Sequence, residues 1–214
     1  MIHSIEDIQG FIDRIEAGEF TLPNSVMTIE GFSSYKVRQL LNRLCSKPDT
    51  TYLEIGLHVG STFIPALYNN PIKAAVGIDN WSLPDYFNGG DRRDDLENNL
   101  LLYTSRKIPI TIIDADCFTV DLEKLPHDVD VYFYDGDHCR QAQYDAIKYF
   151  APVLADEFIL IIDDFNWAEP REETYHALKD LNYEIVHEWL LPAYHERDTE
   201  QWWNGLFVGM IRKE

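Results

Sequence analysis

The sequence predicts one α/β domain built on a mainly parallel sheet, and two patterns support this fold class. From residue 50 onward, short apolar runs such as TYLEIG, AAVGID and ITIIDAD alternate with helical stretches. Continuous apolar strands separated by helices are typical of a parallel sheet that is buried on both faces. The last two runs, YEIVHEWLL and NGLFVGMIRK, have no helix between them, which is compatible with an antiparallel edge.

The N-terminal region predicts a helical cap on this sheet. Apolar residues recur at three- and four-residue steps over 5–17, with Ser4 as the capping residue and Asp7 three positions later. A second amphipathic helix is expected over 33–45. No linker, repeat or low-complexity tract divides the chain, so we expect one domain over 1–214. Within it, 1–48 form the cap and 50–214 form the core.

Composition narrows the classes of function. The 214 residues are 45% hydrophobic and 13% aromatic, and 18 basic against 37 acidic side chains give a net charge of −19. A charge of this sign repels phosphate groups, so we expect neither a nucleic-acid partner nor an anionic membrane surface. The three cysteines form no CxxC pair, and the sequence shows no signal peptide or spanning segment. A cytoplasmic location is therefore expected.

A glycine-containing loop follows the first predicted strand, in the order Glu54-Ile55-Gly56-Leu57-His58-Val59-Gly60-Ser61. Ligands of open parallel sheets bind beyond the carboxyl ends of the strands, where strand order reverses. The dinucleotide fingerprint GxGxxG fails here, because His58 stands where its middle glycine belongs. S-adenosylmethionine carries an ammonium, a sulfonium and a carboxylate in place of a pyrophosphate. Glu54 suits its ammonium group, directly or through water.

The next two strands supply further candidate ligands of the same cofactor. Asp79 ends the second strand, 25 residues after Glu54, where its carboxylate can accept both ribose hydroxyls. Asp116 follows the third strand and is placed to accept the exocyclic amine of an adenine, with Cys117 or Phe118 against the ring. The complete predicted cofactor set is Glu54, Gly56, Gly60, Ser61, Asp79, Asn80, Asp116, Cys117 and Asp135.

Acidic side chains also close two strongly apolar strands. Asp135-Gly136-Asp137-His138 follows VDVYFY, and Asp163-Asp164 follows FILII. If these strands are neighbours, their ends lie about 4.8 Å apart. Like charges at that spacing raise pKa values, and a hard cation such as Mg²⁺ relieves them. Such a metal would lower the pKa of a substrate hydroxyl, with Asp137 or His138 as general base and Asp135 beside the reacting atoms.

These motifs resemble those of a known family. YLEIGLHVGSTF, VGID, the DGDH turn and IIDDF are similar to class I S-adenosylmethionine-dependent methyltransferases of small molecules, above all those of the macrocin O-methyltransferase type. The resemblance covers about residues 50–167. It implies a Rossmann-like methyltransferase fold, with seven strands, an antiparallel last strand and helices on both faces. It also implies Mg²⁺ bound by Asp135, Asp163 and Asp164, with Asp137 as base.

Two aromatic regions are candidates for the acceptor pocket of such an enzyme. The segment 80–99 is a candidate lid, with Trp81, Tyr86 and Phe87 and a Gly89-Gly90 hinge. Trp167 and the Trp202-Trp203 pair are candidate wall residues.

Several functions remain open from the sequence. The first is metal-assisted methyl transfer to a hydroxyl of a small molecule. The second is metal-free transfer to oxygen or nitrogen, with Asp137 or His138 as base. The third is a nucleoside-binding module without chemistry. A nicotinamide dehydrogenase is disfavoured by the glycine spacing.

Overall fold

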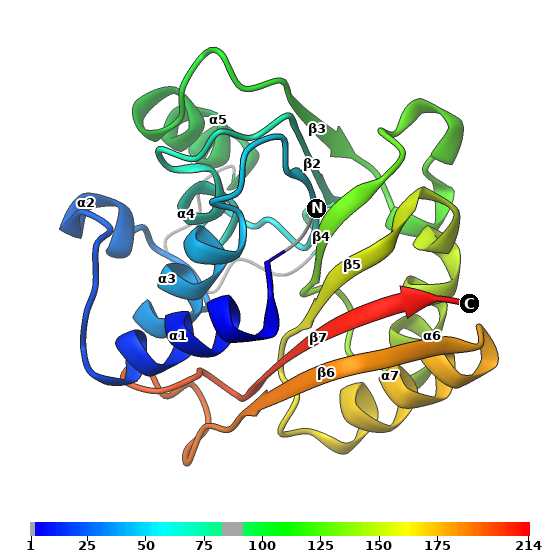
Figure 1. Ribbon diagram of the computed structural model, residues 1–214. Coiled ribbons are helices and arrows are strands. Elements are labelled where there is room, and N and C mark those ends of the chain that lie inside the picture. The colour runs from blue at the N-terminus through cyan, green and yellow to red at the C-terminus, as the bar shows by residue number, and fades with distance from the viewer. Residues whose placement is uncertain (1–2, 83–91) are drawn as a thin grey trace.

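The computed structural model describes residues 3–82 and 92–214, and these form a seven-stranded sheet between two layers of helices (Figure 1). The strand order is β3-β2-β1-β4-β5-β7-β6, and β7 runs antiparallel to both of its neighbours. The pairs among β1 to β5 are all parallel. The strands are β1 (Thr51–Ile55), β2 (Ala74–Asp79), β3 (Ile110–Asp114), β4 (Val129–Tyr134), β5 (Leu154–Ile162), β6 (Tyr183–Leu191) and β7 (Leu206–Lys213). The predicted fold class is confirmed.

The helices cover the two faces of the sheet unequally. One face carries α1 (Ile5–Glu16), α2 (Asn24–Met27), α3 (Tyr35–Leu44), α4 (Phe63–Leu67) and α5 (Arg92–Tyr103). The other carries α6 (Arg140–Phe150) and α7 (Ala168–Asp180) (Figure 1). No helix in the described part of the chain has the length and apolar character to span a bilayer.

Strand position explains the apolar patterns. All five residues of β1 are buried because β1 lies at the centre of the sheet, whereas edge strand β3 is half exposed. Side chains alternate between faces, so Tyr52 joins the core under α1, α3 and α4, while Leu53 joins the core under α6 and α7.

The N-terminal cap is packed against the far end of the chain. Helix α1 begins with the predicted capping box, in which Ser4 and Asp7 bond each other's backbone N–H groups. Trp189 of β6 donates from Nε1 to Gln9 of α1 over 2.8 Å. Figure 1 shows α1 beside β6 and β7, so the N-terminal cap packs against the last strands of the sheet.

The order in which the chain adds strands to the sheet reverses beside β1. The chain passes from β1 to β2 and β3 on one side, then returns to place β4 and β5 on the other. The carboxyl ends of these five parallel strands lie at one edge of the sheet. In open α/β sheets this reversal opens a crevice for ligands.

Candidate functional site

A cavity of about 1170 Å³ lies at this reversal point. Its walls come from the ends of β1, β2, β4 and β5, from the segment after β3, and from the loop between β6 and β7. Single small-molecule pockets typically measure about 300–1,000 Å³. The cavity is therefore larger than a typical pocket for one small molecule.

The glycine loop depends on its two glycines for different reasons. Gly56 lines the cavity with φ +90°, and a Cβ there would lie 1.9 Å from the backbone oxygen of Asp135. Gly60 has φ +86°, and a Cβ there would lie 2.7 Å from Leu96 of α5. Both positions favour glycine. Gly56 faces the cavity, whereas Gly60 lies behind the wall and supports the turn into α4.

Asp79 ties the glycine loop to the end of β2. Its Oδ2 accepts hydrogen bonds from the backbone N–H groups of Leu57 and His58, at 2.8 and 2.7 Å. Its Oδ1 accepts from the N–H of Trp81 at 2.7 Å. Asp79 and Asn80 both line the cavity. The carboxylate is thus held by three backbone donors in the place where a cofactor ribose was predicted.

His58, which the sequence left without a role, forms part of the cavity wall. Its φ of +48° places it in the left-handed region, where histidine occurs more often than most residues. Its ring centroid lies 5.2 Å from that of Phe32, and its carbonyl accepts from Nε1 of Trp81 at 3.0 Å. Phe32 also lines the cavity, and no local sequence signal marked it.

Glu54 lies behind the cavity wall rather than in it. The side chain is 0% exposed, and its carboxyl accepts hydrogen bonds from the Tyr52 hydroxyl and, at 2.6 Å, from Thr62. Burial raises the pKa of Glu54 to about 8, against the two hydrogen bonds, which lower it. Thr62 does line the cavity, so Glu54 reaches the site through Thr62. A direct contact of Glu54 with a cofactor stays a prediction.

Ser61 connects the N-terminal cap to the glycine loop. It lines the cavity, and its Oγ lies 3.5 Å from Oγ of Ser33. A Cβ added to Gly31 would lie 2.2 Å from the same Oγ. The segment after α2 therefore packs directly on the predicted cofactor loop.

The segment after β3 forms the opposite rim. Asp116 and Cys117 line the cavity, and Oδ1 of Asp116 accepts from the N–H of Phe118 at 2.9 Å. Burial, followed by the nearby Asp116 carboxylate, raises the pKa of the Cys117 thiol to about 12. Cys117 is thus a packing residue of this wall and not a thiolate.

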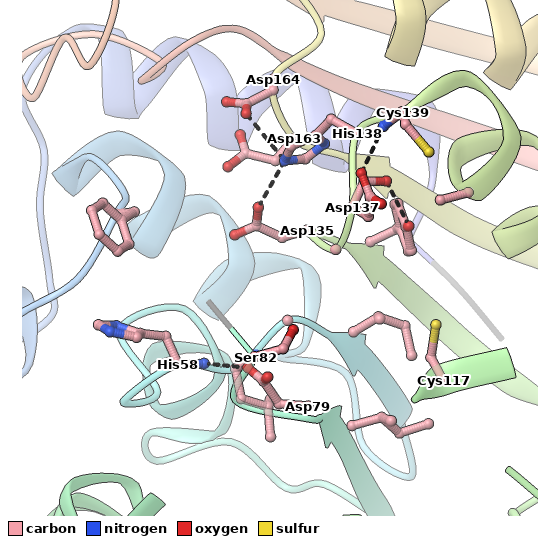
Figure 2. A pocket seen from close by; sticks show the side chains of 18 of the residues that line it. His58, Asp79, Ser82, Cys117, Asp135, Asp137, His138, Cys139, Asp163 and Asp164 are labelled. Atoms are coloured by element: carbon pink, nitrogen blue, oxygen red, sulfur yellow. Dashed lines mark hydrogen bonds and ion pairs between the residues drawn. The ribbon is translucent and has the colours of Figure 1, made fainter. Parts of the chain in front are cut away.

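Three of the predicted carboxylates converge on one histidine. Nε2 of His138 lies 3.1 Å from Oδ2 of Asp164 and 3.6 Å from Oδ1 of Asp135. Figure 2 shows Asp135, Asp163 and Asp164 gathered around His138, across the cavity from Asp79. The parallel pairing of β4 with β5 brings these strand ends together, as predicted.

The three acids perturb one another. Burial, together with Asp164, raises the pKa of Asp135, and burial, together with Asp135, raises that of Asp163. Burial also raises the pKa of Asp164, opposed by His138 and by a hydrogen bond from Asn204 over 2.7 Å. Asn204 comes from the loop before β7, and sequence reasoning missed it.

The arrangement does not fit the predicted Mg²⁺ ion. Within residues 3–82 and 92–214, no three His, Cys, Asp or Glu side chains are placed to hold a metal. The imidazole of His138 stands between Asp135 and Asp164, which the metal would have to bridge. The expectation that Asp135, Asp163 and Asp164 form a metal site is therefore not supported by this geometry.

Asp137 turns away from the cluster. It is exposed, and its Oδ1 accepts from the N–H of Cys139 at 2.9 Å at the start of α6. Figure 2 shows it on the far side of His138 from Asp163. Its described contact is that of a turn residue.

The aromatic residues predicted to line the acceptor pocket differ in whether they reach the cavity. Trp167 and Trp203 line the cavity, and the Trp167 ring meets His138 edge-on at 5.6 Å. Trp202 is buried and donates from Nε1 to Glu16 at 2.6 Å, so it anchors the β6–β7 loop to α1. Of the candidate lid, residues 83–91 lie outside the described residues, including Tyr86, Phe87 and the Gly89-Gly90 pair.

Comparison by sequence does not identify a family for this chain. No family model matches the chain. A protein of Acanthamoeba polyphaga mimivirus is 24% identical over 136 residues, which are 61% of this chain and 58% of the viral protein. The chain therefore spans little more than half the length of this relative. The likeness to the macrocin O-methyltransferase type stays a prediction.

Comparison by structure identifies the fold. TYW2 of M. jannaschii, solved with AdoMet, superimposes with a TM-score of 0.58 at 10% identity, over 91% of this chain and 82% of that one. A precorrin-6y methyltransferase of Geobacter metallireducens gives 0.59 at 16% identity, over 94% and 96%. A Pyrococcus horikoshii protein described as a candidate RNA methyltransferase gives 0.56 at 13% identity, over 96% of both. The chain has the Rossmann-like fold of S-adenosylmethionine-dependent methyltransferases.

Proposed function

We propose that this protein transfers a methyl group from S-adenosylmethionine to a small-molecule acceptor. The observation that carries the proposal is the cavity at the strand reversal of a methyltransferase fold. The glycine loop and Asp79 lie on one side of it, and the His138 cluster lies on the other. We assign the cofactor to the first side, named here the loop side, and the acceptor to the second, named the acid side. The acid side comprises Asp135, His138, Asp163, Asp164 and Trp167.

On the loop side, the backbone of Gly56 and the carboxylate of Asp79 are the principal cofactor contacts. Ser61 and Asn80 line the same wall, and Asp116 with Cys117 lies at the adenine end. Glu54 acts as a positioning residue through Thr62. Gly60 holds the loop in shape from behind.

On the acid side, His138 is the proposed general base. The bound cofactor supplies a methyl group activated by its sulfonium. An N–H at Nε2 donated to Asp164 leaves Nδ1 of the ring to accept the acceptor's proton, as in other carboxylate–histidine pairs. Nδ1 is buried without a hydrogen-bond partner among the described residues. Asp135 borders the cofactor and the imidazole, between the two sides.

The surroundings of the cavity favour the metal-free route and a small acceptor. An imidazole already occupies the space between the carboxylates, so the acceptor atom is oxygen or nitrogen without metal assistance. Acidic side chains predominate among the described lining residues, and the chain carries a net charge of −19. This field disfavours RNA, although the fold alone permits it.

Binding of S-adenosylhomocysteine tests the cofactor assignment. A ligand present at tenfold its dissociation constant adds about 1.4 kcal/mol to the free energy of unfolding, seen as a thermal shift. The shift should be equal in EDTA and in Mg²⁺. No shift at millimolar ligand would overturn the proposed function.

Substitution of His138 tests the catalytic assignment. Removal of a general base typically costs about 10²–10⁴ in rate. We expect His138→Gln to lose at least about a hundredfold in kcat while S-adenosylhomocysteine binding stays within a few-fold. Methyl transfer at the wild-type rate by this variant would exclude His138 as the base.

A further inference from the structure

One carboxylate on the acid side has an oxygen without a hydrogen-bond partner in the part of the chain that the structure describes. Asp163 lines the cavity and is 1% exposed. Within the described residues, its Oδ1 is buried and accepts no hydrogen bond. A buried polar atom without a partner is costly, and a buried carboxylate is more costly than a neutral group.

The neighbouring hydrogen-bond donors contact the other two acids, Asp135 and Asp164. Nε2 of His138 lies closest to Asp164 and next to Asp135, and Nδ2 of Asn204 donates to Asp164. None of these donors reaches Oδ1 of Asp163. Figure 2 shows the Asp163 carboxylate between those of Asp135 and Asp164, so it lies within an acidic wall.

The rest of the acid side adds an aromatic surface and more negative charge. The Trp167 side chain is 38% exposed and lies over His138, and its backbone N–H donates to the carbonyl of Asp164. Glu169 and Glu196 also line the cavity. Tryptophan faces attract cations because the ring carries negative charge density on its face.

The arginines near this wall do not neutralise Asp163. Arg140 and Arg197 both line the cavity. Arg140 pairs with Glu172 and Glu173, at 2.7 and 2.8 Å. Arg197 is exposed in the β6–β7 loop, and its charge acts on Asp164. The wall therefore lacks a described cation that contacts the Asp163 carboxylate.

We propose that the acceptor carries a cationic amino group, which Asp163 binds by a charge-assisted hydrogen bond beside the face of Trp167. This assignment of substrate class rests on the proposed methyl transfer. An ammonium supplies both the hydrogen-bond donor and the positive charge that Oδ1 of Asp163 lacks. A neutral hydroxyl supplies only the donor.

The test compares matched amines and alcohols by calorimetry. Benzylamine is titrated against benzyl alcohol, and cyclohexylamine against cyclohexanol, into the protein saturated with S-adenosylhomocysteine in EDTA at neutral pH. Charge-assisted hydrogen bonds are about twice as strong as neutral ones, so we expect at least one amine to bind about tenfold or more tightly than its alcohol. Equal binding within each pair, or no binding of any amine at millimolar concentration, overturns the proposal.

Two variants and a control test whether Asp163 and Trp167 cause the preference for amines. Asp163→Asn should abolish the preference for amines, whereas Asp156→Asn, the same change at an exposed position of β5, should keep it. Trp167→Leu, at a partly exposed site, should reduce amine affinity severalfold and does not depend on Asp163→Asn folding. A preference that survives in Asp163→Asn also overturns the proposal.

The same titrations without S-adenosylhomocysteine separate this inference from the proposed function. If amines bind selectively but the cofactor product does not bind, methyl transfer fails and the cation site stands. If the product binds and the amine preference is missing, the cation site fails and methyl transfer stands.

Discussion

The two sides of the cavity differ in how their acidic side chains are hydrogen-bonded. On the loop side, Asp79 accepts three backbone hydrogen bonds, and Glu54 accepts two from side-chain hydroxyls. On the acid side, the carboxylates of Asp135 and Asp164 share one imidazole, and Asp163 keeps an oxygen without a hydrogen-bond partner among the described residues. The acidic side chains of the loop side therefore have their hydrogen bonds in the absence of a ligand. The acid side keeps an acceptor oxygen to which a ligand can bond. Substitutions should therefore damage structure on the loop side and chemistry on the acid side.

The largest structural effect is expected at Gly56. Gly56→Ala places a Cβ against the Asp135 backbone at positive φ, which combines backbone strain with overpacking. We expect a loss of about 3 kcal/mol or more in the free energy of unfolding, measured by urea denaturation. Gly10→Ala is the control, because a Cβ there meets nothing within 4 Å in α1. That change should stabilise by about 0.5–1 kcal/mol. A Gly56→Ala protein of wild-type stability would contradict the rigid loop side.

Glu54 should give an effect of similar size, visible as a pH dependence. Its pKa of about 8 in the fold lies above its ordinary 4.5, so the folded chain holds a proton that the unfolded chain releases. Stability from this group is complete below pH 4.5 and is lost as the pH rises through 8. Glu54→Gln removes this loss, so its stability relative to wild type should rise by roughly 3–4 kcal/mol from pH 5 to 8.

The measurement is a set of denaturation curves across that pH range. Exposed Glu123→Gln serves as the control and should track the wild type at every pH. Parallel curves for Glu54→Gln and wild type would mean that Glu54 is ionised in the fold.

Asp79 should show an intermediate effect, on ligand binding as well as on stability. In Asp79→Asn, an amide N–H₂ replaces one acceptor oxygen, so it faces a backbone donor and no longer accepts from a ribose hydroxyl. Hydrogen bonds to charged groups are worth about 1.5–3 kcal/mol, so S-adenosylhomocysteine affinity should fall about 10–100-fold by calorimetry. Among the described residues, Asp114 lies opposite Asp79 on β3 and pairs with exposed Arg93, so Asp114→Asn should change affinity little. Equal losses in both variants would remove the special role of Asp79.

The smallest effect is expected at Asp137, and it sharpens the choice of base. Asparagine forms the same side-chain-to-backbone turn as aspartate, so Asp137→Asn should keep the hydrogen bond from the Cys139 N–H and wild-type stability. With His138 as base, kcat should stay within about threefold of wild type. A hundredfold loss in a stable Asp137→Asn protein would move the base to Asp137.

Local patterns were enough for the architecture. The apolar runs, their spacing and the capping box predicted the strands of the sheet, its antiparallel end and helix α1. They also predicted which acids close β2, β4 and β5, because each acid directly follows a continuous apolar run. These signals are short-range, and the parallel topology then places all the strand ends at one edge.

The same reasoning could not decide what those acids contact. Sequence spacing led us to expect a metal between Asp135, Asp163 and Asp164, but the structure places the His138 ring there. Asn204 reaches Asp164 from 40 residues away in the chain. No local signal reports such a contact, since it depends on how β7 docks against β5.

The glycine loop shows which features follow from the sequence and which follow from the tertiary structure. The sequence alone determined that a turn with two glycines, Gly56 and Gly60, follows β1. Both glycines have a positive φ and no room for a Cβ. The tertiary structure alone decided that Glu54 lies behind the wall, that Phe32 packs on His58, and that Oδ1 of Asp163 accepts no hydrogen bond from the described residues. Backbone conformation is set by the residue itself, whereas burial and pairing are set by segments that meet only when the chain folds.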